Sequence, residues 1–158
     1  MNDPQRTRGV IERLYEFLER NGFEYEKDAA AGGAAVQLSG EDFPIRLELS
    51  VSDRAQRLDV YSVLTFGLRP ERAADLARAV NFINGRTAGG KFALNLADET
   101  VCYIGSAFFA GAAVGDDFIK NLISEAYYQI ETYNDQLYAV NRGLLTVKEF
   151  MIQNGADR

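Results

Sequence analysis

The feature that most constrains the fold is the stretch from residue 91 to residue 109, which predicts a tight β-hairpin. Its first arm, residues 91–96, alternates apolar with small or polar side chains, as a strand with one buried face does. A polar pair, Asp98 and Glu99, predicts the turn. The second arm has apolar side chains on both faces, with Val101, Tyr103, Ala107 and Phe109 on one and Cys102, Ile104 and Phe108 on the other. We therefore expect the chain's own helices on one side of this strand, and a second copy or a client protein on the other.

Amphipathic helices are expected before and after the strands. Residues 7–20 carry apolar side chains three and four positions apart and are followed by an Asn-Gly pair. A second helix is predicted over residues 70–85, where a proline suits the first turn, and a long third helix over residues 115–143. Thr146 and Glu149 then have the spacing of a capping box, which predicts a short last helix.

Alternating apolar positions predict three strands between the first two helices, at residues 35–38, 43–51 and 58–66. Residues 23–28 are a further candidate for a short strand. Consecutive strands joined by short turns favour an antiparallel sheet with helices mainly on one face. The predicted fold is α+β, in the order α-β-β-β-α-β-β-α with an extra C-terminal helix. We expect one domain over residues 1–158, with its core at about 5–140 and a helical extension at 144–155.

The charge balance argues against nucleic acid as a direct partner. The 158 residues include 17 basic and 23 acidic side chains, a net charge of −6, whereas binding to a phosphate backbone draws its affinity from a basic surface. No apolar run approaches the ~18 residues of a membrane span, and no secretory signal is recognised at the start. The single cysteine fits a reducing compartment. We expect a cytoplasmic protein without a membrane partner.

The absence of histidine from the sequence removes the commonest catalytic base and the commonest transition-metal ligand. Ser-His-Asp and Cys-His catalysis are therefore excluded. Cys102 lies in the middle of a strand without a basic neighbour, which is typical of a structural thiol. We expect no catalytic residue, no metal site and no cofactor; a divalent cation held by carboxylates, and an enzyme that uses only carboxylates and tyrosines, stay open as alternatives.

Residues 85–91 match the Gly-x-x-x-x-Gly-Lys part of a phosphate-binding loop, but their surroundings do not. Phe92 stands where Ser or Thr holds magnesium, a predicted helix precedes the glycines, and a predicted strand follows them. The motif is interpreted as a helix-to-strand connection, and no nucleotide binding is expected.

A family resemblance enters through the second half of the chain. Asn81-Phe82-Ile83-Asn84 at a helix end, the hairpin from Gly90 onward with its acidic turn, residues 108–114 and the following long helix together resemble the YbjN family, over roughly residues 5–140. That family is similar in fold to the chaperones of type III secretion systems. The resemblance implies a chain that dimerises and holds segments of client proteins on an exposed apolar surface. The helix after Thr146 departs from the basic pattern of the family.

The function implied by the resemblance is that of a non-enzymatic, homodimeric protein-binding module, a chaperone-like adaptor or regulator of an unidentified client protein. The alternative is a small-molecule-sensing regulatory domain with its pocket between sheet and helices. The residues predicted to contact a partner are Tyr103, Phe109, Tyr127 and Tyr128, because they lie beside the main apolar stripes of the hairpin and the long helix.

Overall fold

The computed structural model describes residues 4–28, 30, 32–52, 54–110 and 112–156, with side chains from residue 9 onward. The helices are α1 (Pro4–Arg20), α2 (Ala73–Asn84), α3 (Asp116–Arg142) and α4 (Val147–Gln153), and the 3-10 helix η1 (Pro70–Arg72) leads into α2. The strands are β1 (Glu24–Asp28), β2 (Gly33–Ser39), β3 (Pro44–Ser52), β4 (Arg57–Gly67), β5 (Lys91–Asn95) and β6 (Thr100–Phe108). All neighbouring strands run antiparallel, in the order β1-β2-β3-β4-β6-β5.

The predicted α+β fold is confirmed, with one addition to its element order. The candidate strand near residues 24–28 is formed as β1, so four strands precede α2 where the predicted order has three. β1 is an edge strand whose side chains are mostly charged and exposed, so its own sequence hardly alternates. Its conformation is fixed by pairing with β2.

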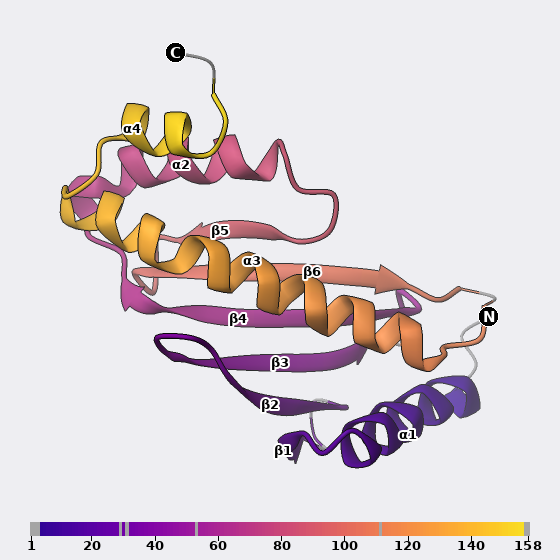
Figure 1. Ribbon diagram of the computed structural model, residues 1–158. Helices are drawn as coiled ribbons and strands as arrows, with labels where there is room; N and C mark the ends of the chain where they lie inside the picture. The colour runs from indigo at the N-terminus through magenta and orange to yellow at the C-terminus, as the bar shows by residue number, and fades with distance from the viewer. Residues whose placement is uncertain (1–3, 29, 31, 53, 111, 157–158) are drawn as a thin grey trace.

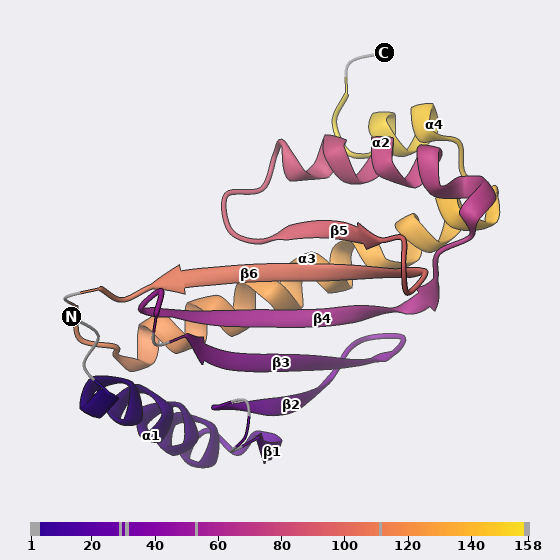
Figure 2. The same cartoon turned by 180° about the vertical axis from the view of Figure 1, so that it is seen from behind.

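The helices gather on one side of the sheet (Figure 1). α3 crosses the sheet on the same side as α1, while α2 lies beyond the β5 edge and α4 packs on α2. Seen from behind, β3, β4 and β6 have no helix in front of them (Figure 2). The sheet is therefore covered on one face only, and we call the other face of β3, β4, β6 and β5 the open sheet face.

The register of β6 confirms the two-sided strand predicted from the sequence. Val101, Tyr103 and Phe109 are buried on the side of α3, in one core cluster with residues of β2, β3 and β4. On the opposite side, Ile104 is 43% exposed and Phe108 is 65% exposed. Because side chains alternate along a strand, this division places the two sets on opposite faces of the sheet.

Three asparagine side chains join the helices to the sheet through backbone groups. Asn84, the last residue of α2, accepts a hydrogen bond from the N–H of Phe92 and donates one to its carbonyl, both at 2.9 Å. Asn141 of α3 bonds the Gly67 carbonyl and the Arg69 N–H in the same way, at 2.8 and 2.9 Å. Asn134, two turns earlier, accepts from the Thr65 N–H at 3.2 Å. The last two side chains supply partners where β4 departs from regular pairing, between Val63 and Gly67.

The last helix begins at the predicted capping box. The Thr146 hydroxyl accepts from the Glu149 N–H, and the Glu149 carboxylate accepts from the Thr146 N–H. Phe150 is fully buried, with its ring edge-on to Phe82 of α2. Asn154 donates to the Gln136 side chain at 2.7 Å, which ties α4 to α3 as well.

Candidate partner-binding surfaces

The open sheet face carries the largest group of exposed apolar side chains in the sheet. Val63 of β4 is 48% exposed and faces the same side as Ile104 and Phe108 of β6. Tyr61 lies directly beside Ile104, and Cys102 lies between Val63 and Ala93 in the next row. Val63, Tyr61 and Ile104 are neighbours, whereas Phe108 lies beside Arg57, beyond the polar pair Ser106 and Asp59. Exposed apolar side chains grouped like the first three are typical of surfaces that meet another protein.

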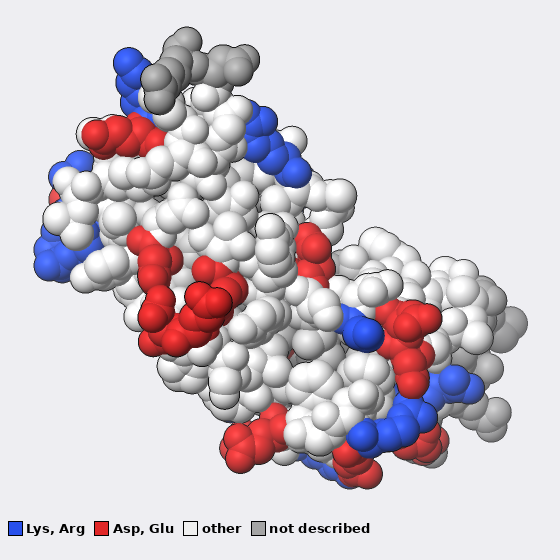
Figure 3. Space-filling model, viewed as in Figure 1, with Lys and Arg blue, Asp and Glu red and all other residues white. Residues whose placement is uncertain are grey.

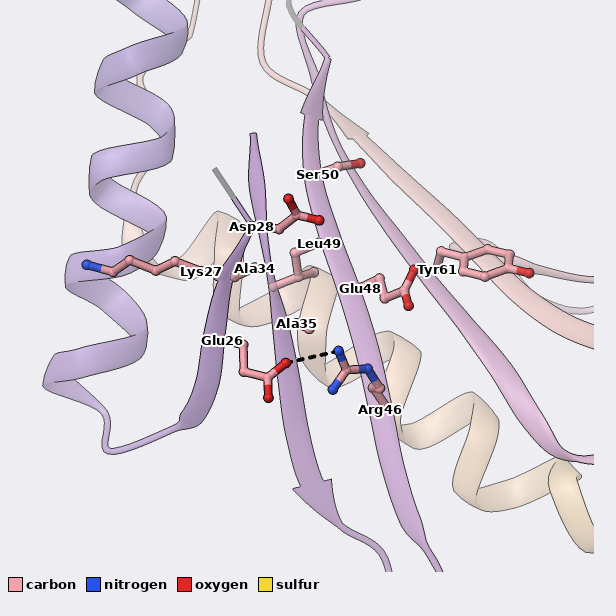
Figure 4. Close-up of a pocket in the computed structure, with 10 residues that line it drawn as sticks. All are labelled: Glu26, Lys27, Asp28, Ala34, Ala35, Arg46, Glu48, Leu49, Ser50 and Tyr61. Atoms are coloured by element: carbon pink, nitrogen blue, oxygen red, sulfur yellow. Dashed lines mark hydrogen bonds and ion pairs between the residues drawn. The ribbon is translucent and has the colours of Figure 1, made fainter. Parts of the chain in front are cut away.

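The β1–β3 side of this face is hollowed and acidic. A hollow of about 400 Å³ is lined by side chains of β1, β2, β3 and β4, among them Glu26, Asp28, Glu48 and Tyr61. Figure 4 shows Glu48 and Tyr61 side by side, with Glu26 joined to Arg46 across the hollow at 3.3 Å. Within the part of the chain that the structure describes, no three carboxylates or thiols are grouped as metal ligands. The lining holds three carboxylates, of Glu26, Asp28 and Glu48, and two basic side chains, Lys27 and Arg46.

A second hollow lies on the helical side, between α3 and the connection from α2 to β5. Its volume is about 570 Å³, and its lining residues are Ala88, Gly89, Asn121, Ser124, Glu125 and Tyr128. Tyr128 is 63% exposed at its rim. Figure 3, viewed from this side, shows broad uncharged areas between the groups of acidic side chains. The hollow thus places one exposed aromatic ring, of a residue type enriched where proteins meet, beside small and polar side chains.

Tyr103 and Phe109 do not lie where the sequence prediction placed them. Both are 1% exposed and belong to the core, so the expectation that they stand beside it is wrong. The Tyr103 ring packs edge-on to Phe92, and its hydroxyl accepts a hydrogen bond from the Gly90 N–H at 3.1 Å. Burial raises the pKa of the Tyr103 hydroxyl to about 12, and the charge of Glu125 acts in the same direction. The sequence shows which face of β6 these residues occupy, but not that α3 and β5 close over them.

Tyr127 and Tyr128 keep access to the surface. Tyr127 is partly buried and donates its hydroxyl to the Ser39 carbonyl at 3.3 Å, so it bridges α3 to the end of β2. Tyr128 stands at the rim of the α3 hollow with most of its side chain in solvent. Of the four predicted contact residues, Tyr128 is therefore the best placed to meet a partner.

Cys102 and the glycine-rich connection lie where the sequence predicts. Cys102 is buried, and burial raises the pKa of its thiol, opposite to what a nucleophile needs. The glycine-rich connection follows a helix end at Asn84 and leads into β5, as predicted. No described helix has the length and apolar composition that crossing a membrane requires.

Sequence analysis missed the contribution of β4 to the open sheet face. Leu58, Val60 and Leu64 of this strand are buried, whereas Tyr61 and Val63 point to the other face. The signal was present in the sequence, because β4, like β6, carries large side chains at both odd and even positions. Such a strand indicates surface to be covered on both sides of a sheet.

Solved structures with a similar fold define the structural class of this protein. Two solved complexes contain a chain of similar fold. In the ExsC–ExsE complex the similarity has a TM-score of 0.63 and 16% identity, and it covers 83% of this chain and 95% of the other. In the HopA1–SchA chaperone-effector complex the TM-score is 0.59 and the identity 13%, with coverage of 84% of this chain and 98% of the other. These neighbours include type III secretion chaperones, so the class is an α+β protein with a type III secretion chaperone-like fold.

The chain belongs to the YbjN family, whose model, described as a putative bacterial sensory transduction regulator, matches residues 11–139. The crystal structure of YbjN, a putative transcription regulator from E. coli, is similar as well, with a TM-score of 0.63 and 13% identity over 84% of this chain and 92% of that one. At these identities the solved structures establish the fold alone. No protein with curated annotation matches the sequence.

Proposed function

We propose that this protein is a non-enzymatic, homodimeric protein-binding module, a chaperone-like adaptor or regulator that holds a client protein in the cytoplasm. The observation that carries the proposal is Tyr128, which is 63% exposed at the rim of an open, largely uncharged hollow on α3. A solvated helix face normally carries charged side chains, whereas exposed tyrosines beside a hollow are enriched where proteins meet. The complexes that contain similar chains support a protein as the bound partner.

The two surfaces serve different partners in this proposal. The α3 hollow with Tyr128 receives the client, and Tyr127, on the same helix but outside the lining of the hollow, is a second proposed contact. The open sheet face, with Val63, Ile104 and Phe108, receives the second copy of the chain. The alternative function is that of a small-molecule sensor with its pocket between sheet and helices; the apolar core in that space supports it less than the exposed Tyr128 supports a protein partner.

The test compares alanine variants in two measurements, folding stability and affinity for the partner recovered from the native lysate. Tyr128→Ala should weaken client binding about thirtyfold, which corresponds to ~2 kcal/mol, and change the free energy of unfolding by less than ~0.5 kcal/mol. Tyr138→Ala is the matched control, because Tyr138 is also exposed on α3 but packs edge-on to Phe66, outside the lining of the hollow.

Tyr103→Ala and Phe109→Ala should instead lower the free energy of unfolding by roughly 3–5 kcal/mol, since both side chains are buried. Equal client affinity in the wild type, Tyr128→Ala and Tyr138→Ala would contradict the assignment of the α3 hollow to the client.

A further inference from the structure

The open sheet face carries a row of side chains whose order across the strands is acidic, aromatic, aliphatic and basic. Register pairs place Glu48 of β3 beside Tyr61 of β4, Tyr61 beside Ile104 of β6, and Ile104 beside Lys91 of β5. Residues paired in this way point to the same face of the sheet at the same height along the strands. The row therefore begins with a carboxylate and ends with an ammonium group, with apolar surface between them.

Within the part of the chain that the structure describes, neither Glu48 nor Lys91 forms an ion pair. The ion pairs on this face join Arg46 to Glu26 and Arg57 to Asp59, and Glu48 and Lys91 take part in neither. Glu48 and Lys91 are both exposed, and the chain as a whole carries a net charge of −6. The row carries a negative charge at one end, a positive charge at the other and apolar surface between them. A second copy whose strands lie in the reverse order therefore places opposite charges opposite one another.

We propose that a second copy of the chain covers the open sheet face, related by a two-fold axis that runs parallel to the strands between β4 and β6. Rotation about this axis keeps each residue's height along the strands and reverses the order of the strands. Glu48 then pairs with Lys91 of the partner subunit, and Tyr61 packs on Ile104 of the partner subunit. This arrangement rests on the proposed homodimer and specifies its geometry.

The arrangement satisfies the usual rules of symmetric sheet packing. In an isologous contact each interaction occurs twice, so the row supplies two ion pairs around a shared apolar centre. Stacked sheets keep their strands within about 30° of each other, which leaves residues near the axis in register. Val63 and Cys102 are register partners in the neighbouring row. In the dimer, Val63 of one subunit therefore faces Cys102 of the partner subunit.

Other placements of a second copy fit less well. A two-fold axis across the strands would set β5 of one subunit over β5 of its partner, where Lys91 meets no carboxylate because that face of β5 carries only Lys91, Ala93 and Asn95. The outer side of α2 is already covered by α4 of the same chain, with Phe150 fully buried and edge-on to Phe82. The charge order of the row therefore favours the reversed-strand arrangement.

The experiment is a charge-reversal cycle on the full chain, with the dimer dissociation constant measured by sedimentation equilibrium at low salt. Glu48→Lys and Lys91→Glu, each alone, place like charges opposite one another and should raise the Kd of the dimer at least about tenfold. The double variant restores both pairs with reversed sign and should return the Kd to within about threefold of wild type. Glu12→Lys and Lys120→Glu, exposed on α1 and α3, make the same charge changes away from this face and should leave the Kd unchanged. Circular dichroism confirms that every variant is folded.

The outcomes separate this arrangement from the proposed function. If Ile104→Asp dissolves the dimer but the single charge reversals do not weaken it, the open sheet face is the interface and the two-fold geometry proposed for it is wrong. If the double variant stays as weak as the single ones, the pairing of Glu48 with Lys91 of the partner subunit is overturned. A wild type that is monomeric throughout overturns both the geometry and the homodimer, and client binding is then tested by Tyr128→Ala alone. A monomer whose client affinity falls in Ile104→Asp assigns this face to the client instead.

Discussion

At the scale of single residues, Tyr103 joins the glycine-rich connection to the core. Its hydroxyl accepts from the Gly90 N–H, while its ring packs on Phe92 inside the sheet–helix interface. A Cβ atom at Gly90 would overlap the Tyr103 hydroxyl, so glycine is required at this position by close approach. The connection thus has a structural reason for this glycine that involves no phosphate. That no nucleotide binds here stays a prediction.

The raised pKa of Tyr103 predicts a loss of stability at high pH. The folded-state pKa of about 12 lies above the ordinary value of 10.0, so the unfolded chain loses this proton first. The protonated Tyr103 hydroxyl contributes its full share to the free energy of unfolding below pH 10, and this share is lost as pH rises through about 12. For a pKa shift of this size the share is roughly 1–3 kcal/mol. Urea unfolding between pH 8 and pH 12 should show a shallower decline for Tyr103→Phe than for wild type. Tyr128→Phe, which removes an exposed hydroxyl, is the control and should keep the wild-type decline.

At the scale of elements, α3 supports the sheet by hydrogen bonds as well as by apolar packing. Asn134 and Asn141 lie two turns apart on the buried side of the helix and are each 2% exposed. Their amides bond the backbone of β4 and of the residues after it, where the strand leaves its regular pairing with β6. The irregular end of β4 is therefore stabilised by side chains of α3. The residues joined by these hydrogen bonds are 69 to 74 positions apart in the sequence.

Removing the Asn141 side chain should destabilise this junction. Asn141→Ala leaves the Gly67 carbonyl and the Arg69 N–H without their partner in a part-buried site, which should lower the free energy of unfolding by about 2–4 kcal/mol. Guanidinium unfolding at neutral pH measures the change. Asn121→Ala, on the exposed side of the same helix, should change it by less than ~0.5 kcal/mol. Equal effects of the two substitutions would show that the amide contacts add nothing to stability.

The elements that the sequence predicted well are those with local signals. The hairpin has an alternating arm and an acidic turn, the long helix ends at Gly143 in a left-handed conformation, and the last helix starts at its capping box. Residues 23–28 are only a candidate strand in the sequence, because β1 is held by pairing with β2, and the roles of Asn134 and Asn141 could not be predicted, because contacts between distant segments determine them. The same reason explains the misplaced Tyr103 and Phe109: periodicity gives the face of a strand, but not how far the helices extend over it.

At the scale of the whole molecule, α4 decides which faces remain available. It packs on α2 and is tied to α3 through Asn154 and Gln136, so the second helical layer is closed by the chain itself. The sheet stays uncovered on the side away from α3, with Ile104 and Phe108 on its surface, and on the helical side the α3 hollow stays open beside Tyr128. The extension after residue 143 is thus built into the packing of the molecule and covers the outer side of α2.

If residues 1–158 form one domain, a change in α4 must affect the unfolding of the whole chain. Phe150→Ala removes a fully buried ring from the α2–α4 contact and should lower the free energy of unfolding by roughly 3–4 kcal/mol. The protein has no tryptophan, so far-ultraviolet circular dichroism and tyrosine fluorescence are the two probes, and their transitions should coincide for wild type and variant. Lys148→Ala, exposed on the same helix, is the control and should leave the transition in place. A Phe150→Ala variant with an unshifted main transition would show that α4 is an appendage, because loss of the ring would then unfold only the last helix while the sheet and α3 kept their full stability.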